Sequence, residues 1–369
     1  MSPGIADELT QSAARLEQLR WRIEALTGGA PVSRVAHELH DALTTELARS
    51  AQTFADLARH PLGPKASWTD MPQFSTNPIK AVEAKGGPWH DAFGPITPRV
   101  VNVFGNEAYV VLEVQIPLRQ RRALLVREDS LRGDPFTLNA AFVCHCGDSI
   151  GAVEAYYDVA TVMRGVGVLP DMPLGHDERD ATAPMVLHAS GFARRSAELV
   201  RQTGVAWPVS VREPPRFGLG TTRTARANAK NCEGIHQAFV KHDPGRFGEL
   251  IAEDAVWIDV PTGEVLNGAV AAAHHDHGNW MQAFPDSQAD VTNMVANDHW
   301  VAVQHRGYGT HSGPLELGGH VFPATGRPVD IRVLDVVEYA DGQAVLIRNY
   351  YDMGLMIVNL GVADVVAGG

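Results

Sequence analysis

The sequence predicts an α+β protein in which one domain occurs twice in tandem, and three observations support this prediction. An aromatic frame recurs: residues 68–72 read WTDMP and residues 257–261 read WIDVP, while residues 156–158 and 350–352 both read YYD. The spacing of the aromatic anchors also agrees, with a period of about 190 residues. In each copy, finally, segments with helical periodicity precede segments that alternate apolar and polar residues.

The first copy begins with helices. Leucine and alanine recur at helical spacing over residues 5–27, and Gly28 and Gly29 end this segment. A second helix is predicted over residues 33–59. Strands follow, separated by glycine, proline and aspartate turns, and they are predicted over residues 99–104, 108–116, 121–127, 136–146 and 150–157.

A connecting segment leads to the second copy. Residues 169–184 are rich in proline, aspartate and charge, which predicts a linker. A helix over residues 185–203 and a stretch rich in proline and glycine over residues 204–221 follow it. The second copy then repeats the order of helix and strands, with a helix over residues 222–242 and strands over residues 255–260, 289–296, 299–308, 328–339 and 343–351.

Length and composition indicate a globular protein with more than one domain, because 369 residues exceed what one hydrophobic core usually holds. The net charge of −12 argues against nucleic acid or an acidic membrane as partner, since no basic patch is available to displace counterions. No apolar run approaches the roughly 20 residues of a membrane span, and the first residues do not form a secretory signal. Three cysteines cannot form a disulfide framework, so a cytoplasmic location is expected.

Several motifs follow one another in the second copy: LIAED at residues 250–254, VWID at 256–259, GTHSG at 309–313, PATGR at 323–327 and YYD at 350–352. In this order, over residues 231–362, they resemble the SnoaL-like branch of the nuclear-transport-factor-2-like superfamily. The first copy resembles the same family more faintly, because it lacks the GTH and ATGR elements.

The resemblance implies a cone in each copy, in which a curved, mostly antiparallel sheet wraps around helices and encloses an apolar pocket. We therefore expect two tandem cone-shaped α+β barrel domains. The first copy is expected to be a pseudo-subunit that forms an internal dimer with the second, and a homodimer of the whole chain is the alternative. The expected parts are an N-terminal helix at 1–32, a degenerate SnoaL-like domain at 33–168, a linker with a helix at 169–221 and a SnoaL-like domain with the active pocket at 222–369.

Comparison of the two copies separates residues that the fold needs from candidates for a site. On three strands of the second copy, an otherwise apolar face is interrupted by one polar residue, namely His305, Asp335 and Asn349. The residues that align with these three in the first copy are apolar, namely Val114, Ala141 and Ala155. The polar trio therefore belongs to the second copy alone.

These three side chains are expected to meet in the pocket of the second copy. A carboxylate among valines is expected to have a raised pKa, which would make Asp335 a general base. His305 would be the acid or the donor to an oxyanion, and Asn349 would orient the substrate. Asp335 also occupies the strand after the PATGR turn, where the resemblance implies a functional aspartate. The alternative is that the three groups satisfy one another in a core.

The remaining polar and aromatic candidates are assigned as follows. Further substrate contacts are predicted for His311, His320, Trp257, Trp280 and Tyr351. Aspartates that both copies share are interpreted as capping or turn-fixing groups, namely Asp70 with Asp259 and Asp158 with Asp352. No metal site is predicted, because the histidines within residues 274–277 lack an evident third ligand and Cys144 and Cys146 are spaced too closely. No cofactor is expected.

The leading hypothesis is a cofactor-independent enzyme that removes a proton next to the carbonyl of a small apolar molecule, polyketide-like, terpenoid or aromatic. The outcome would be cyclisation, isomerisation or elimination. The alternative is a protein that only binds a hydrophobic ligand or acts as a scaffold. Epoxide hydrolysis is a further alternative, but Gly307 and Asn349 stand where limonene-epoxide-hydrolase relatives carry acidic residues.

Overall fold

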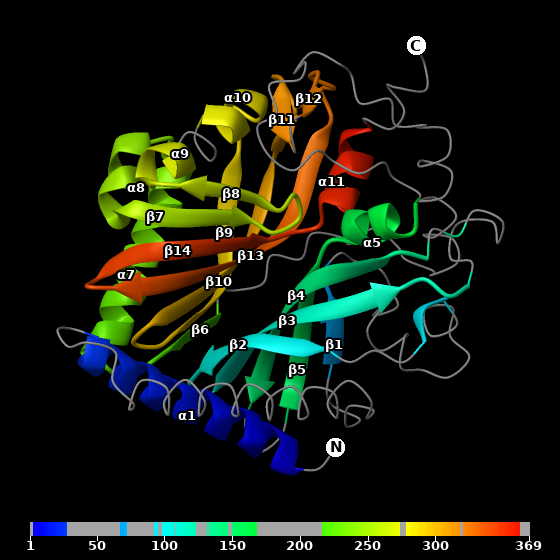
Figure 1. Cartoon of the computed structure of the whole chain (residues 1–369). Helices are drawn as coiled ribbons and strands as arrows, with labels where there is room; N and C mark the ends of the chain where they lie inside the picture. Colours follow the sequence, from blue (N-terminus) through cyan, green and yellow to red (C-terminus); the bar gives the residue numbers. More distant parts are fainter. Residues whose placement is uncertain are drawn as a thin grey trace.

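The architecture is α+β, as the sequence predicts, with two open sheets of five and seven strands and a separate two-stranded hairpin (Figure 1). Neither sheet closes into a barrel, since each has two edge strands. The computed structural model describes residues 3–27, 67–71, 92–94, 98–106, 108–122, 131, 133–146, 150–167, 216–273, 278–317 and 320–361. The predicted helices over 33–59 and 185–203 and the predicted linker over 169–184 lie outside these residues.

The smaller sheet belongs to the first copy. Its strands lie side by side in the order β1 (Ser67–Asp70), β5 (Ile150–Tyr157), β4 (Pro135–Cys146), β3 (Tyr109–Arg119) and β2 (Arg99–Gly105). Strands β2 to β5 form an antiparallel meander, and β1 pairs with β5 in parallel. The predicted strand over residues 121–127 is not present at residues 121–122, because β3 ends at Arg119; the rest of it lies outside the described residues.

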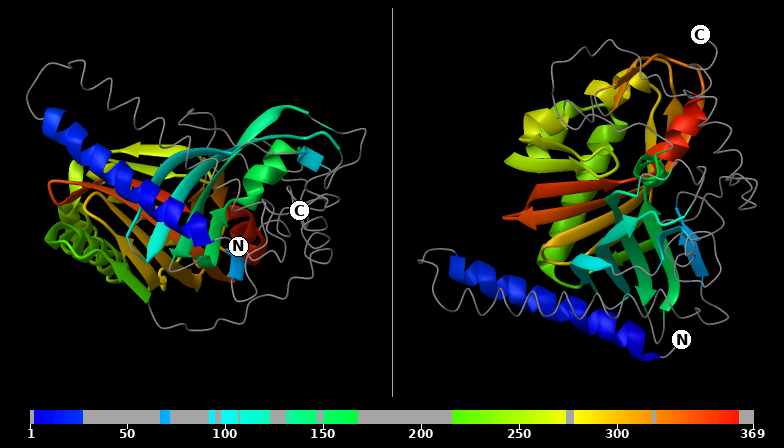
Figure 2. Two further views of the ribbon diagram at one scale, coloured as in Figure 1. Left: turned by 90° about the horizontal axis from the view of Figure 1, so that it is seen from below. Right: turned by 45° about the vertical axis from the view of Figure 1, so that its right-hand side comes forward.

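Two of the described helices, α1 and α5, accompany this sheet. The long helix α1 (Pro3–Thr27) packs across it, with Leu9 and Leu16 fully buried in the apolar cluster that the strands form (Figure 2). The short helix α5 (Val159–Gly165) directly follows β5. In the described part of the chain, no helix is long and apolar enough to cross a membrane.

The larger sheet belongs to the second copy. Its strands lie in the order β6 (Arg216–Leu219), β9 (Gln288–Ala296), β10 (Trp300–Thr310), β13 (Pro328–Ala340), β14 (Gln343–Tyr350), β7 (Ile251–Asp259) and β8 (Glu264–Asn267). Its helices are α7 (Arg223–Val240), α8 (Pro244–Leu250), α9 (Ala269–Ala273), α10 (Met281–Ala283) and α11 (Met353–Leu360), and the hairpin consists of β11 (Leu315–Leu317) and β12 (His320–Phe322). Strand β6 lies within the stretch over 204–221 that the sequence predicts to be a linker.

The two sheets share one strand order. The order β1-β5-β4-β3-β2 of the first copy matches the order β7-β14-β13-β10-β9 of the second. The register agrees as well, because Asp70 lies opposite Ala155 and Asp259 lies opposite Asn349 in the parallel pair of each sheet. This shared topology accompanies the sequence repeat; the assignment of the first copy to a degenerate SnoaL-like domain stays a prediction.

One face of each sheet packs against the other sheet. The buried residues of this interface are Phe104, Tyr109, Val111, Ala141, Val143 and Tyr156 from the first copy and Val295, Trp300, Ala302, Leu334, Val336 and Tyr350 from the second. The rings of Phe104 and Trp300 stack with their centroids 5.5 Å apart. Helix α7 packs on the other face of the larger sheet (Figure 1). Each sheet is thus buried on both faces.

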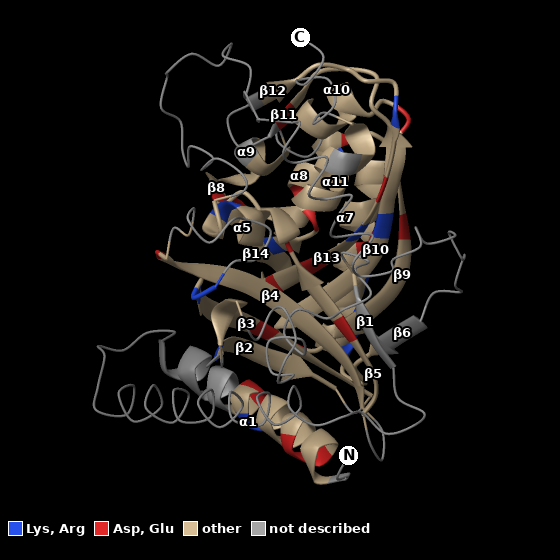
Figure 3. Ribbon diagram, turned by 90° about the vertical axis from the view of Figure 1, so that its right-hand side faces the viewer, with Lys and Arg blue, Asp and Glu red and all other residues tan. Residues whose placement is uncertain are grey.

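A buried ion pair crosses the interface between the sheets. Charged residues are few along the strands (Figure 3), and Glu113 on β3 is fully buried. Its carboxylate accepts hydrogen bonds from Arg348 Nε at 2.6 Å and from Arg348 Nη2. It also accepts from Tyr350 at 2.8 Å and from Asn102 at 2.7 Å. Four donors therefore compensate the loss of water around this carboxylate.

The two copies also exchange helix caps. The Oδ1 atom of Asp158 accepts from the backbone nitrogen of Met353 at 3.0 Å, at the start of α11. In return, the Oδ1 atom of Asp352 accepts from the nitrogen of Val159 at 3.0 Å, at the start of α5. Each aspartate thus caps its own helix, with Asp158 accepting from Ala160 and Asp352 from Gly354, and also the first nitrogen of the helix in the other copy, which confirms the capping interpretation of this pair. Burial and the neighbouring Asp158 raise the pKa of Asp352.

The ion pair between the sheets gives a first prediction. Arg348→Met leaves the Glu113 carboxylate buried without its cation, so we expect the free energy of unfolding to fall by about 3–5 kcal/mol. Urea denaturation of both proteins measures this difference. The double variant Glu113→Gln with Arg348→Met removes the charge as well and should recover most of the loss. A single-variant loss below about 1 kcal/mol, as for exposed pairs, would contradict the prediction.

The apolar interface gives a second prediction. Residues 222–369 produced alone expose the face that carries Trp300, Leu334 and Val336, so we expect the fragment to aggregate or self-associate. Size-exclusion chromatography with light scattering measures its state. Leu334→Glu in the same fragment should reduce association, because it places a charge on the exposed face. A soluble, monomeric and fully active fragment would show that the second copy does not need the first.

Candidate active site

Three neighbouring strands of the larger sheet each place one polar side chain on the face that α7 covers. Asp335 on β13 lies directly opposite Asn349 on β14, and His305 on β10 lies opposite Val333, two residues before Asp335. The distance from Asp335 Oδ2 to His305 Nε2 is 3.1 Å, and Asn349 Nδ2 donates to Asp335 Oδ1 over 2.5 Å. The structure therefore brings together the three polar residues that the strand periodicity predicts to meet.

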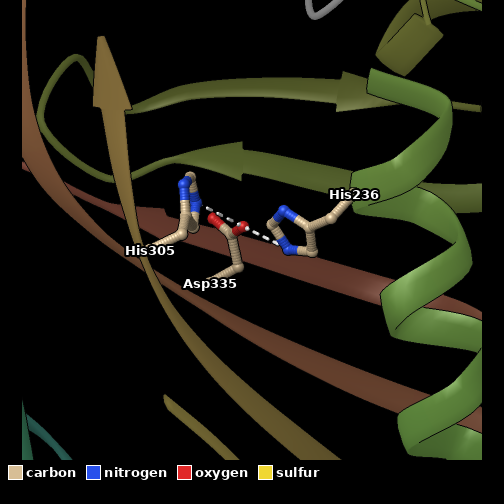
Figure 4. A group of neighbouring side chains, drawn as sticks. All are labelled: His236, His305 and Asp335. Carbon is tan, nitrogen blue, oxygen red and sulfur yellow. Dashed lines mark hydrogen bonds and ion pairs between the residues drawn. The ribbon is translucent and has the colours of Figure 1, made fainter. Parts of the chain in front are cut away.

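A fourth member of the cluster, His236, is missing from the sequence prediction. It projects from α7, and its Nε2 atom lies 3.4 Å from Asp335 Oδ2 (Figure 4). Its ring centroid is 4.7 Å from that of His305. The sequence holds a signal for it, because His236 continues the buried helical face of Ala225, Ala229 and Cys232. Only packing, however, shows that this face meets Asp335.

The partners of Asp335 decide its ionisation. Burial raises the pKa of this carboxyl, but electrostatic interaction with the nearby imidazoles of His305 and His236 and the hydrogen bonds of His305 and Asn349 outweigh burial, so its pKa lies below the ordinary value. The predicted raised pKa is therefore wrong. The strand pattern shows valines around Asp335, while the donors that stabilise its charge come from three other elements. For His236, burial and the charge of His305 lower the pKa to about 4, which leaves its imidazole neutral at pH 7.

The cluster lies at one side of an apolar cavity of about 100 Å³. Its apolar lining includes Ile235, Phe239, Leu315, Ile331 and Val333. Trp257, Trp280 and Tyr351, three of the predicted substrate contacts, line the same cavity. A small molecule in this space would contact apolar side chains everywhere except at the polar cluster, at Asn279 and at Tyr351.

One predicted substrate contact, His311, is not among the described residues at the cavity. His311 is fully buried, but its ring packs against Phe284 at 5.3 Å, and its Nδ1 atom lies 3.1 Å from Thr325 Oγ1. It is not among the residues that line the cavity, because the turn before PATGR holds it on the side of Phe284. Burial lowers its pKa. His320 begins β12, and its side chain lies outside the described part of the structure, as do the histidines within residues 274–277.

Asp259, one of the shared aspartates, fixes a residue of the cavity wall. Its Oδ2 atom accepts from the hydroxyl of Tyr351 at 3.1 Å, and its backbone oxygen accepts from Gly263 in the turn that leads to β8. Burial raises the pKa of Asp259 to about 7. The side chain of Asp259 thus positions Tyr351, while its interpretation as a turn-fixing group stays a prediction, because the turn is closed through its backbone. Nothing is described of the side chain of Asp70.

The first copy has no counterpart of the polar cluster. The strand pairing places Val114, Phe142 and Ala155 at the positions of His305, Asp335 and Asn349. The sequence alignment predicts Ala141 in place of Phe142 and is wrong by one residue, because Ala141 points into the interface between the sheets and Phe142 points to the opposite face. All three side chains are buried in an apolar cluster together with α1.

Comparison with known families identifies the domain that carries the cavity. Residues 233–347 match a family described as the SnoaL-like domain. The second copy is a SnoaL-like domain. The match includes His236, His305 and Asp335 and ends two residues before Asn349. Comparison with curated proteins gives no match.

Solved structures similar to this chain cover about one domain of it. A candidate SnoaL-like polyketide cyclase from Jannaschia sp. CCS1 is 20% identical, covers 39% of this chain and 97% of its own, and has a TM-score of 0.35. IdmH, a candidate polyketide cyclase from Streptomyces antibioticus, is 27% identical over 36% of this chain and 98% of its own, with a TM-score of 0.32. AclR, a candidate hydroxylase from Streptomyces galilaeus, is 22% identical, covers 37% of this chain and 96% of its own, and also has a TM-score of 0.32.

The raised pKa of Asp259 gives a third prediction. The folded SnoaL-like domain keeps a proton on Asp259 up to about pH 7, whereas the unfolded chain releases it near its ordinary pKa of about 3.9. The stabilising contribution is therefore fully present below about pH 4 and is lost as the pH rises to 7. Each pH unit in this window lowers the free energy of unfolding by about 1.4 kcal/mol, or about 4 kcal/mol in total.

Urea denaturation from pH 4 to pH 8 tests this prediction by comparison with Asp259→Asn, which cannot titrate at this position. Other titrating groups occur in both proteins, so they cancel in the difference between the two stability curves. We expect the original protein to lose stability relative to the variant as the pH rises. Parallel curves would mean that Asp259 is ionised in the folded protein at pH 4.

Proposed function

We propose that this protein is an acid–base enzyme in which the SnoaL-like domain removes and returns a proton on a small, apolar, carbonyl-bearing molecule. A domain of this family with an apolar cavity and a cluster of titratable side chains supports a function of the cyclase or isomerase type. The observation that carries the proposal is the state of His305. Its Nδ1 atom is buried and has no hydrogen-bond partner among the described residues, while its Nε2 atom faces Asp335.

The contact with Asp335 selects one tautomer of His305. An ionised carboxylate only accepts hydrogen bonds, so Nε2 carries the proton and donates to Asp335 Oδ2. Nδ1 is then left with a free lone pair. A base must present such a lone pair within reach of the substrate, and His305 lines the cavity. In this arrangement Nδ1 takes the proton next to the carbonyl.

Asp335 supports this step without taking the proton itself. Its two oxygens have hydrogen-bond partners in His305 and Asn349, and the Nε2 atom of His236 lies 3.4 Å from Oδ2. When His305 becomes an imidazolium, the carboxylate stabilises the new positive charge at 3.1 Å. The sequence assigns Asp335 as base and His305 as acid; we propose instead that His305 is the base and that Asp335 stabilises its charged form, because a hydrogen-bonded carboxylate with a lowered pKa is a poor proton acceptor.

The other side chains of the cavity complete the proposed site. Asn349 holds the Oδ1 atom of Asp335 and so keeps Oδ2 directed at the two imidazoles. Tyr351 and Asn279 are the polar groups of the wall outside the cluster, and they are candidates to bind the carbonyl oxygen of the substrate. Return of the proton to a different carbon gives an isomer, and its transfer to a departing hydroxyl eliminates water. Attack of the enolate carbon on a second carbonyl, whose oxygen then takes the proton, gives a cyclised product. We propose that no cofactor takes part in this chemistry.

Two other functions are less well supported. Binding of a hydrophobic ligand does not require a buried imidazole that a carboxylate holds in one tautomer, whereas acid–base catalysis does. Epoxide hydrolysis of the limonene-epoxide-hydrolase kind needs acidic residues where Gly307 and Asn349 stand. Arg306, the cation of that stretch, is held by Asp330 at 2.7 and 2.8 Å, away from Asp335.

Proton abstraction can be measured before the physiological substrate is known. We expect the protein to exchange deuterium from D2O into the carbon next to the carbonyl of aromatic and aliphatic ketones and 1,3-diketones, as followed by mass spectrometry. His305→Gln should lower this rate by about 10²–10⁴-fold, because it removes the base. Asp335→Asn should lower the rate and also shift the pH profile to lower pH, because the imidazolium loses its carboxylate.

An exposed histidine supplies the control for this experiment. His242 lies on the surface at the end of α7, so His242→Gln should leave the exchange rate unchanged. If His305→Gln exchanges as fast as the original protein on every ketone that reacts, the assignment of His305 as base is wrong. A protein that exchanges none of these ketones and yet binds them would support the ligand-binding alternative.

A further inference from the structure

Two imidazoles and one carboxylate from three different elements converge in the cavity (Figure 4). We propose that His236, His305 and Asp335 form a binding site for a divalent transition-metal ion of the Zn²⁺ class, and that the bound ion inactivates the base of the site. The binding itself goes beyond the proposed function and stands on the donor geometry. Its effect on turnover rests on the proposed function.

The spacing of the donor atoms fits such an ion. One ligand atom from each of the three residues lies within 4.8 Å of the other two. Asp335 Oδ2 is 3.1 Å from His305 Nε2 and 3.4 Å from His236 Nε2. Bonds of about 2.0–2.2 Å to a tetrahedral Zn²⁺ place neighbouring ligand atoms about 3.4 Å apart. The ion therefore fits between the carboxylate and the two rings after small movements of the side chains.

The chemistry of the donors selects the kind of ion. Imidazole nitrogen suits Zn²⁺ and its neighbours in the first transition row, whereas Mg²⁺ and Ca²⁺ require a shell of oxygen ligands. A ring must also be uncharged to bind a metal ion, so binding should weaken as the pH falls. Three protein ligands leave a fourth position open toward the cavity, where water or a carbonyl oxygen can bind.

Neighbouring groups prepare the carboxylate for one metal bond. Asn349 donates to Asp335 Oδ1, which leaves Oδ2 as the atom that faces the two rings. A hydrogen bond of this kind behind a ligand orients it and limits its freedom. Val114 and Phe142 occupy the equivalent places in the first copy. One chain should therefore bind one ion.

The bound ion would change the tautomer of His305. In the metal-free site the ring carries its proton on Nε2 and presents a lone pair at Nδ1. A metal bond at Nε2 moves the proton of the neutral ring to Nδ1, so no net proton is gained or lost by the ring. The atom that we propose as the base is then a donor. Metal binding and proton abstraction are thus mutually exclusive at this residue.

Binding is tested by titration of the full chain with ZnCl₂ in an isothermal calorimeter, after treatment with a chelator. We expect one equivalent to bind, and His236→Gln and Asp335→Asn each to weaken binding by at least about tenfold. The chain has 16 histidines, so surface binding needs a control. His242→Gln, and the triple variant His274→Gln, His275→Gln and His277→Gln, should bind as the original chain does. Binding that survives both site variants, or no binding, would overturn the proposed site.

A second measurement separates the metal site from the proposed function. Nitrogen-15 NMR of the imidazole rings reports which nitrogen of His305 carries the proton, and we expect it to move from Nε2 to Nδ1 as Zn²⁺ is added. Deuterium exchange into ketones should stop at one equivalent and recover with the chelator. If Zn²⁺ moves the proton but exchange continues, the metal site stands and His305 is not the base. If exchange depends on His305 but Zn²⁺ leaves its tautomer unchanged, the function stands and the metal site is wrong.

Discussion

The contact between the two sheets determines which face of the larger sheet can hold the cavity. One face of the larger sheet is buried against the first copy, with Trp300 stacked on Phe104 and Arg348 bound to the buried Glu113. Because side chains alternate along a strand, this contact leaves the opposite face of β10, β13 and β14 for α7 and the cavity. A strand register that differed by one residue would place Asp335 in the interface between the sheets.

The buried carboxylate of Asp335 is the second constraint. A charge in an apolar cavity is costly unless donors surround it, and here they come from β10, β14 and α7. These donors lower the pKa of Asp335 and at the same time orient both imidazoles. The same grouping that favours an Asp–His pair in acid–base chemistry also places two ring nitrogens beside one oxygen, which is the donor set of a metal site. We propose that protons and a metal ion compete for the same atoms.

The two copies differ in their roles: the first is structural, and the second carries the polar cluster. Both keep the strand order, the YYD ending and the aspartates that cap each other's helices. In the first copy, Val114, Phe142 and Ala155 pack into an apolar core with α1, so that no polar cluster forms there. The first copy therefore buries one face of the second sheet and helps to cap α11. We propose that the chemistry belongs to the SnoaL-like domain alone.

The sequence by itself determined the repeat, the α+β class and most strands. It also determined the sheet face on which His305, Asp335 and Asn349 meet. Both follow from patterns that can be read along the chain, namely the alternation within strands and the similarity of the two copies. The sequence also determined that Trp257, Trp280 and Tyr351 belong with these three residues. Only the tertiary structure decided that His236 joins the cluster, that His311 packs on Phe284 instead, and that the pKa of Asp335 falls. These depend on which helix covers the sheet and on donors from distant segments, and electrostatic interactions follow distances in space rather than along the chain.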